Sequence, residues 1–129
     1  MKQIKHMILL CLFCLTGIAA QAQTGPANNE IWYTATAKLA EVSGTKTTAG
    51  LHYEVFTDAD GNPLKKTGHD FYEETGKGVI TFDGDIATVG ENAFYRCVAL
   101  SSVTIPASVT SIGNQAFKQC SKLATVTFA

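Results

Sequence analysis

The chain has 129 residues, of which 46% are hydrophobic and 16% charged, and its 10 Lys and Arg against 11 Asp and Glu give a formal net charge of −1. This length has room for one compact domain, or for one small cap and a short repeat array. The charges are scattered and form no basic patch that would neutralise phosphates, so we expect no nucleic-acid partner.

The N-terminus has the pattern of a secretory signal peptide. Lys2 and Lys5 precede an apolar stretch at residues 7–18, and an Ala-Gln-Ala site follows at residues 20–22. The stretch is shorter than the about 20 apolar residues that span a bilayer, and no second one follows. We predict a signal peptide at residues 1–22, no transmembrane segment, and export to the cell surface, the extracellular space or the periplasm.

Residues 23–68 are predicted to form a leader and a small β-rich N-terminal cap. Residues 31–34 and 51–56 have the composition of strands. The acidic turn at residues 58–63 superficially resembles a calcium loop, but the position that requires Glu in an EF-hand loop is His69. An Asp-Gly hairpin turn is therefore favoured over a metal site.

Two aromatic residues of the cap are candidate sugar-stacking groups. Because side chains alternate along a strand, either Trp32 or Tyr33 faces outward, and an exposed ring there would stack on a glycan. The alternative is that these aromatic side chains only pack in the core. Further along, His69, Asp70, Glu73 and Glu74 lie between glycines without a second histidine at ligand spacing, which favours a solvated charged turn over a metal or acid–base site.

The last two-fifths of the chain repeat with a period of 23 residues. Residues 89–100, VGENAFYRCVAL, return as residues 112–123, IGNQAFKQCSKL. Such a period is typical of stacked coils, each of which needs a neighbour to bury its apolar face. Within a coil we predict a strand such as residues 102–105, a bend, and a short helical turn that begins at Asn114 or Gln115.

Stacking places equivalent positions of the coils side by side. We expect a degenerate first coil at residues 69–82, with Phe71 at the place of Phe94. Two inward ladders follow, namely Ile80, Val103, Val126 and Phe82, Ile105, Phe128. The outward side chains form a flat, uncharged row and are the candidate partner-binding face: Thr81, Ser102, Thr104, Thr125 and Thr127.

Cys97 and Cys120 occupy the same place in consecutive repeats. A disulfide is one alternative, since exported proteins meet oxidising conditions. Each cysteine also shares one side of its turn with an alanine and a leucine, which favours buried free thiols that behave as small hydrophobes.

The pattern Val-Thr-Ile-Pro-x-x-Val-x-x-Ile-Gly-x-x-Ala-Phe-x-x-Cys-x-x-Leu at residues 103–123 closely resembles the BspA-like bacterial leucine-rich repeat, and residues 79–129 follow it. The resemblance implies a curved solenoid exported to the cell surface, and some relatives are adhesins that bind host or bacterial proteins. The predicted fold class is therefore mainly β with short helical turns, as a leucine-rich-repeat solenoid of two full repeats and one degenerate repeat at residues 69–129, after the cap. The array stops in a strand at Phe128 and Ala129, so we expect an open edge that either self-associates or belongs to the front of a longer array.

No catalytic constellation is present in the sequence. No serine occurs in Gly-x-Ser-x-Gly, and neither repeat cysteine has a histidine within its repeat. We predict a non-enzymatic protein without catalytic, cofactor-binding or metal-binding residues. The leading hypothesis is a module for protein–protein interaction or adhesion that binds a protein on a host or bacterial surface. One alternative is a glycan- or cell-wall-binding protein that uses the aromatic residues of the cap. The other is an N-terminal fragment of a longer repeat protein without independent function.

Overall fold

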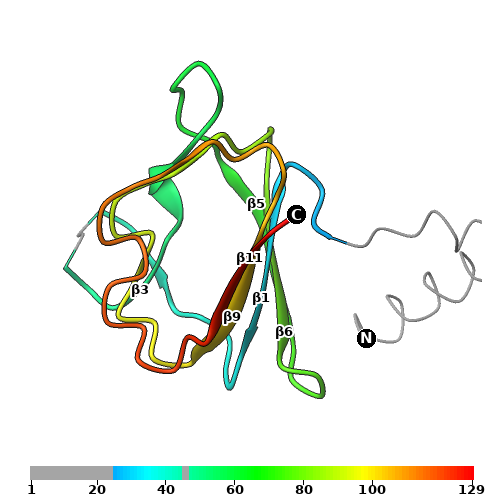
Figure 1. The fold of residues 1–129 in the computed structure, drawn as a ribbon, viewed down its shortest axis with the longest axis vertical. Helices are drawn as coiled ribbons and strands as arrows, with labels where there is room; N and C mark the ends of the chain where they lie inside the picture. Colours follow the sequence, from blue (N-terminus) through cyan, green and yellow to red (C-terminus); the bar gives the residue numbers. More distant parts are fainter. Residues whose placement is uncertain (1–24, 45–46) are drawn as a thin grey trace, which may run out of the picture.

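The computed structural model describes residues 25–44 and 47–129, and its main element is a five-stranded sheet (Figure 1). The order across this sheet is β11-β9-β1-β6-β5. The strands are β1 (Glu30–Ala35), β5 (Lys66–Tyr72), β6 (Lys77–Phe82), β9 (Leu100–Ile105) and β11 (Thr125–Phe128). The predicted signal peptide at residues 1–22 lies outside the described residues.

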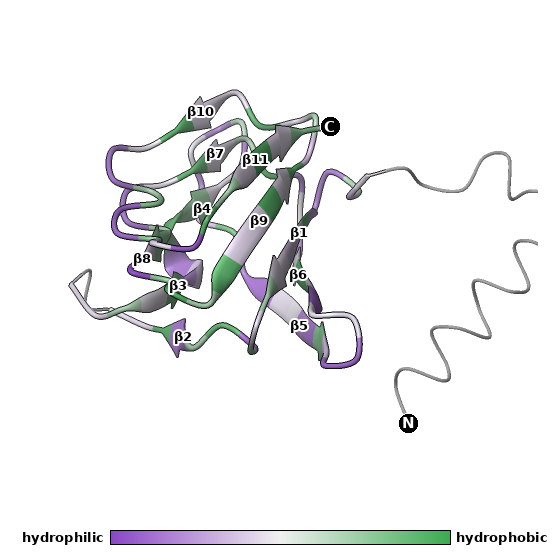
Figure 2. Ribbon diagram, turned by 60° about the horizontal axis from the view of Figure 1, so that its bottom comes forward, coloured by the Kyte–Doolittle hydropathy of each residue, from purple (hydrophilic) through white to green (hydrophobic). Residues whose placement is uncertain are grey.

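Short strands form a second wall that faces the large sheet across the core (Figure 2). They make two three-stranded sheets, ordered β10-β7-β4 and β2-β3-β8. Their bounds are β2 (Glu41–Val42), β3 (Gly50–His52), β4 (Phe56–Thr57), β7 (Thr88–Val89), β8 (Phe94–Tyr95) and β10 (Ser111–Ile112). The fold is therefore mainly β, as expected.

The two full repeats stack in register, which confirms the 23-residue phase. β9 and β11 are parallel, with Val103 opposite Val126 and Ile105 opposite Phe128. β7 and β10 are parallel as well. We call residues 83–105 the first coil and residues 106–129 the second coil. Burial confirms the inward direction of Val103 and Ile105 in β9, whereas Val126 in β11 is half-buried and Phe128 is 60% exposed.

The position of β1 contradicts part of both predicted ladders, because it separates Ile80 and Phe82 of β6 from Val103 and Ile105 of β9. β1 lies between β6 and β9 and runs antiparallel to both, so that Ile31 pairs with Ile80 and Tyr33 pairs with Val103. Ile80 is buried as predicted, but it does not neighbour Val103. An N-terminal segment therefore completes the middle of the sheet, where a separate cap was expected.

The expected degenerate coil at residues 69–82 is wrong, because β5 and β6 form an antiparallel hairpin there. β5 begins at Lys66 and crosses the predicted boundary at residue 68. Phe71 pairs with Gly78 and stacks on the ring of Tyr33, with centroids 6.1 Å apart. Gly78 is required there, because a Cβ atom would come within 2.0 Å of the Tyr33 ring.

The predicted helical turns of the repeats are wrong as well. Residues 114–119 form successive turns, and the equivalent residues of the first coil include the short strand β8. Left-handed backbone recurs at equivalent positions, namely Asn92, Arg96, Gln115 and Gln119, with φ of 61°, 53°, 61° and 59°. Single left-handed residues reverse the chain direction and so prevent a continuous helix.

Residues 51–56 also differ from the single strand that was predicted. β3 ends at His52, a 3-10 helix follows at Tyr53–Val55, and β4 begins at Phe56. This break brings Phe56 against Phe94, with ring centroids 6.0 Å apart. Phe56 thus takes the place beside Phe94 that was expected for Phe71, and the ring series continues to Phe117, 5.2 Å from Phe94.

Candidate functional site

The side of the five-stranded sheet that points away from the core brings the candidate residues together. Residues directly opposite each other on neighbouring strands share a face. Trp32 is opposite Thr104 on one side and Val79 on the other, and Thr104 is opposite Thr127. A second row contains Thr125, Ser102, Thr34, Lys77 and Tyr72. We call this surface the outer sheet face.

All five predicted partner-binding residues lie on the outer sheet face, but they do not form the uncharged row that was expected. β1 separates Thr81 from Thr104, and Thr81 is opposite Glu30 instead. Lys77 and Asp70 add further charges from β6 and β5. The face therefore combines hydroxyl groups with charges and with the aromatic rings of Trp32 and Tyr72.

Trp32 lies at the centre of the outer sheet face and is half-buried. Its Nε1 donates a hydrogen bond to Oε1 of Glu30 over 3.1 Å. Nζ of Lys77 lies 4.7 Å from the ring centroid, a cation–π contact worth about 0.5–1 kcal/mol at an exposed site. These two contacts hold the indole in place, and Lys77 occupies one of its two ring faces.

Tyr33 does not face outward, so it is corrected from a sugar-stacking candidate to a core residue. Its side chain is 1% exposed. The alternation of β1 decides between the two neighbours, because Tyr33 pairs with inward-facing Val103 whereas Trp32 pairs with outward-facing Thr104.

Hydroxyl groups at one end of the outer sheet face bind one another. Oγ1 of Thr34 lies 2.9 Å from Oγ of Ser101 and 2.6 Å from Oγ of Ser102. Ser101 also donates to the carbonyl oxygen of Thr34 over 3.0 Å. The register shift between Thr34 and Ala35 accommodates Ser101 as an extra residue of β9. This cluster fixes the local shape of the face.

Behind the outer sheet face lies a buried polar chain around His69, where a solvated turn was predicted. The His69 side chain contacts Oε2 of Glu41 through Nδ1 and Oη of Tyr33 through Nε2, both over 2.7 Å. Because the Glu41 carboxylate only accepts, Nδ1 donates to it and Nε2 of the neutral ring accepts from Tyr33. Leu39 N donates to the Tyr33 oxygen over 3.4 Å, and Lys66 Nζ lies 3.1 Å from Glu41.

Burial sets the protonation states of this chain. Desolvation lowers the pKa of His69, and the hydrogen bond to Glu41 opposes it. Desolvation also raises the pKa of Tyr33 to about 12. For Glu41, desolvation is outweighed by the hydrogen bonds from His69 and Lys66, so that its pKa is lowered. The chain serves to join β1, β2 and β5, and its buried imidazole is closed to a substrate.

His52 is buried as well, with Nε2 2.7 Å from the carbonyl oxygen of Thr48. The partners of His69 explain why a solvated turn was predicted there. Each imidazole is satisfied by groups that its local sequence pattern does not reveal, and Tyr33 and Glu41 are far from His69 along the chain.

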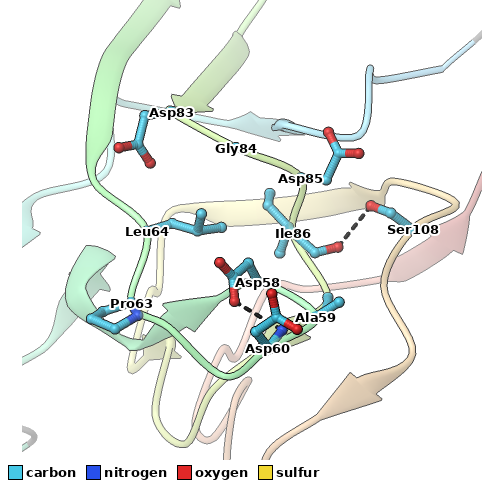
Figure 3. A pocket seen from close by; sticks show the side chains of 11 residues that line it. Asp58, Ala59, Asp60, Pro63, Leu64, Asp83, Gly84, Asp85, Ile86 and Ser108 are labelled. Atoms are coloured by element: carbon cyan, nitrogen blue, oxygen red, sulfur yellow. Dashed lines mark hydrogen bonds between the residues drawn. The ribbon is translucent and has the colours of Figure 1, made fainter.

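A hollow of about 560 Å³ lies between the turn at residues 58–63 and residues 83–87 (Figure 3). Oδ1 of Asp58 accepts from the backbone N–H groups of Asp60 and Asn62, over 3.0 and 2.9 Å, which confirms the predicted turn. Oδ1 of Asp83 accepts from Lys65 N over 3.0 Å. These carboxylates order the chain around the hollow, and no group of three potential metal ligands occurs among the described residues.

Comparison with protein families identifies the repeat. Residues 65–129 match the family described as "BspA type Leucine rich repeat region (6 copies)", and the chain belongs to this family. Members are typically surface modules for protein interaction and are generally non-enzymatic. Neither the curated proteins nor the solved structures contain a match. Within the described residues, no helix is long and apolar enough to cross a membrane.

Proposed function

We propose that this protein is an exported, non-enzymatic adhesion or interaction module that binds a protein partner at a host or bacterial surface through its outer sheet face. The observation that carries the proposal is the position of Trp32 at the centre of rows of hydroxylic side chains from β9 and β11. Tryptophan is enriched among the residues that dominate binding energy at interfaces. The signal-peptide pattern of residues 1–22 supports export.

The outer sheet face has the physical properties that protein recognition requires. Trp32 is held by Glu30 and Lys77, so little side-chain freedom is lost when a partner covers it. Thr104 and Thr127 flank it on the repeat side and offer donors and acceptors at the spacing of neighbouring strands. The anchor is thus preorganised, and its surroundings allow a polar rim.

Binding to arrays of extracellular-matrix and bacterial surface proteins tests the proposal. Trp32→Ala and Thr104→Arg are each expected to weaken binding at least tenfold, because they remove the anchor and place a bulky charge beside it. Asn114→Arg is the matched control, since Asn114 is exposed on the opposite wall. If Thr104→Arg and Asn114→Arg bind equally well, the outer sheet face is not the binding surface.

Glycan binding through Trp32 is the second candidate function. The outward direction of the half-buried indole supports it, but Lys77 covers one ring face, so a sugar must use the other face or displace the ammonium group. A glycan array with Lys77→Ala discriminates the two proposals. If Trp32 stacks on sugars, Lys77→Ala should bind glycans more strongly than the parent, because the ring is uncovered. If Trp32 binds a protein partner instead, neither the parent nor Lys77→Ala should bind glycans.

A further inference from the structure

The thiols of Cys97 and Cys120 lie together between the two coils. Both are free; Cys97 is buried as expected, whereas Cys120 is half-buried. Backbone hydrogen bonds of 2.7 Å from Phe94 N to Ala116 O and from Arg96 N to Lys118 O hold the coils side by side just before the cysteines. Chains paired in this way lie about 4.8 Å apart, which is inside the range of Cα separations in disulfides, about 4.4–6.8 Å.

The two thiols differ in access and in hydrogen bonding. Cys97 is 4% exposed, whereas Cys120 is half-buried. The hydrogen bond from Cys97 to Cys120 raises the pKa of Cys97, with burial adding to the effect, and the same bond lowers the pKa of Cys120. Sγ of Cys120 also donates to the carbonyl oxygen of Phe94, in the first coil, over 2.9 Å.

We propose that Cys97 and Cys120 form a reactive dithiol site that closes to a disulfide between the two coils on reaction with a small-molecule disulfide. Cys120 loses its proton, and its thiolate attacks one sulfur of the oxidant. A mixed disulfide forms while the first oxidant thiolate leaves and takes up a proton. Cys97 then loses its proton and attacks Sγ of Cys120, and the second oxidant thiolate leaves and is protonated. The two protein thiols are oxidised by two electrons, and the oxidant is reduced to two thiols.

The disulfide would fasten the second coil to the first. Among the described residues, β11 is paired with β9 alone and β10 with β7 alone, so the second coil is supported from one side. A cross-link restricts the open states of the segment that it closes. Amide exchange in β11 is expected to slow on the order of a hundredfold after oxidation, whereas exchange in β5, at the other edge of the sheet, stays unchanged.

Treatment of the folded full-length chain with oxidised glutathione tests the site, with Cys11→Ser and Cys14→Ser in all samples so that two thiols remain. Mass spectrometry is expected to show the loss of two hydrogens in a monomer and a peptide linked through Cys97 and Cys120. In Cys97→Ser, the more accessible, half-buried Cys120 is expected to keep a stable glutathione adduct. In Cys120→Ser, the buried Cys97 is expected to react at least tenfold more slowly.

Two results would overturn the proposal. One is that both thiols stay reduced, or that only glutathione adducts accumulate, while circular dichroism shows a folded chain. The other is that Cys97 in Cys120→Ser reacts as fast as Cys120 in Cys97→Ser. Burial would then not make Cys97 the slower thiol, and Cys120 would have no reason to attack first. Denatured protein provides the reactivity control, in which both single variants should react at similar rates.

Discussion

Replacement of Phe94 by alanine provides the most direct test of how the coils are packed. The Phe94 side chain is fully buried between two rings. Phe117 from the second coil stacks on it with centroids 5.2 Å apart and planes 5° from parallel. Phe56 meets it edge-on, 6.0 Å away at 85°. Truncation therefore removes aromatic contacts on both sides and leaves a void that neither rigid neighbour fills.

The expected loss is a large share of the total stability. A buried Phe→Ala change costs about 3–5 kcal/mol. Small domains are stable by about 5–15 kcal/mol in total. Urea unfolding followed by circular dichroism should show this loss for Phe94→Ala, while Phe128→Ala should cost less than about 0.5 kcal/mol, because Phe128 is 60% exposed.

A double-mutant cycle decides which phenylalanine completes the ring series. The structure predicts a coupling energy of about 0.5–1.5 kcal/mol between Phe56 and Phe94, since their rings are in contact. The simple repeat phase would instead couple Phe71 to Phe94. Coupling for Phe71 and none for Phe56 would refute the packing described above, as would a Phe94→Ala variant as stable as the parent.

Three further outcomes are expected. Burial holds the pKa of His69 below its unfolded value of about 6.5, so the stabilising contribution of neutral His69 is complete above that pH and is lost as the pH falls toward the folded pKa. Urea unfolding at pH 7.5 and 5.5 should show this loss. A His69→Gln variant whose stability depends on pH in the same way would contradict it. Gly78→Ala should destabilise the protein by more than about 1 kcal/mol in the same assay, because the Tyr33 ring occupies the space of the new Cβ. Gly61→Asn is the control and should cost much less, because Gly61 has a left-handed turn conformation and open space around it. Concentration-dependent light scattering should reveal self-association through the uncharged edge strand β11, and Thr127→Lys should reduce it; a monomer at every concentration would refute this expectation.

The outer sheet face shows how far pattern reasoning reached. Alternation in β9 and β11 correctly separated Val103 and Val126 from Thr104 and Thr127, because side-chain direction depends only on the local strand period. The same reasoning left Trp32 and Tyr33 undecided. Their directions follow from the pairing of β1 with β9. The inward residues of β9 were predicted from the sequence, but the pairing of β1 with β9 was not.

The sequence by itself determined the strand composition, the 23-residue stacking of the two full coils and the turn at residues 58–63. In each case the physical cause is local or repeats at a constant offset, so equivalent residues meet without knowledge of the rest of the chain. Only the tertiary structure decided that β1 lies inside the sheet and that Tyr33, His69 and Glu41 form one polar chain. A strand's alternation is the same whichever strand lies beside it, and the choice of neighbour depends on which distant apolar faces bury one another best.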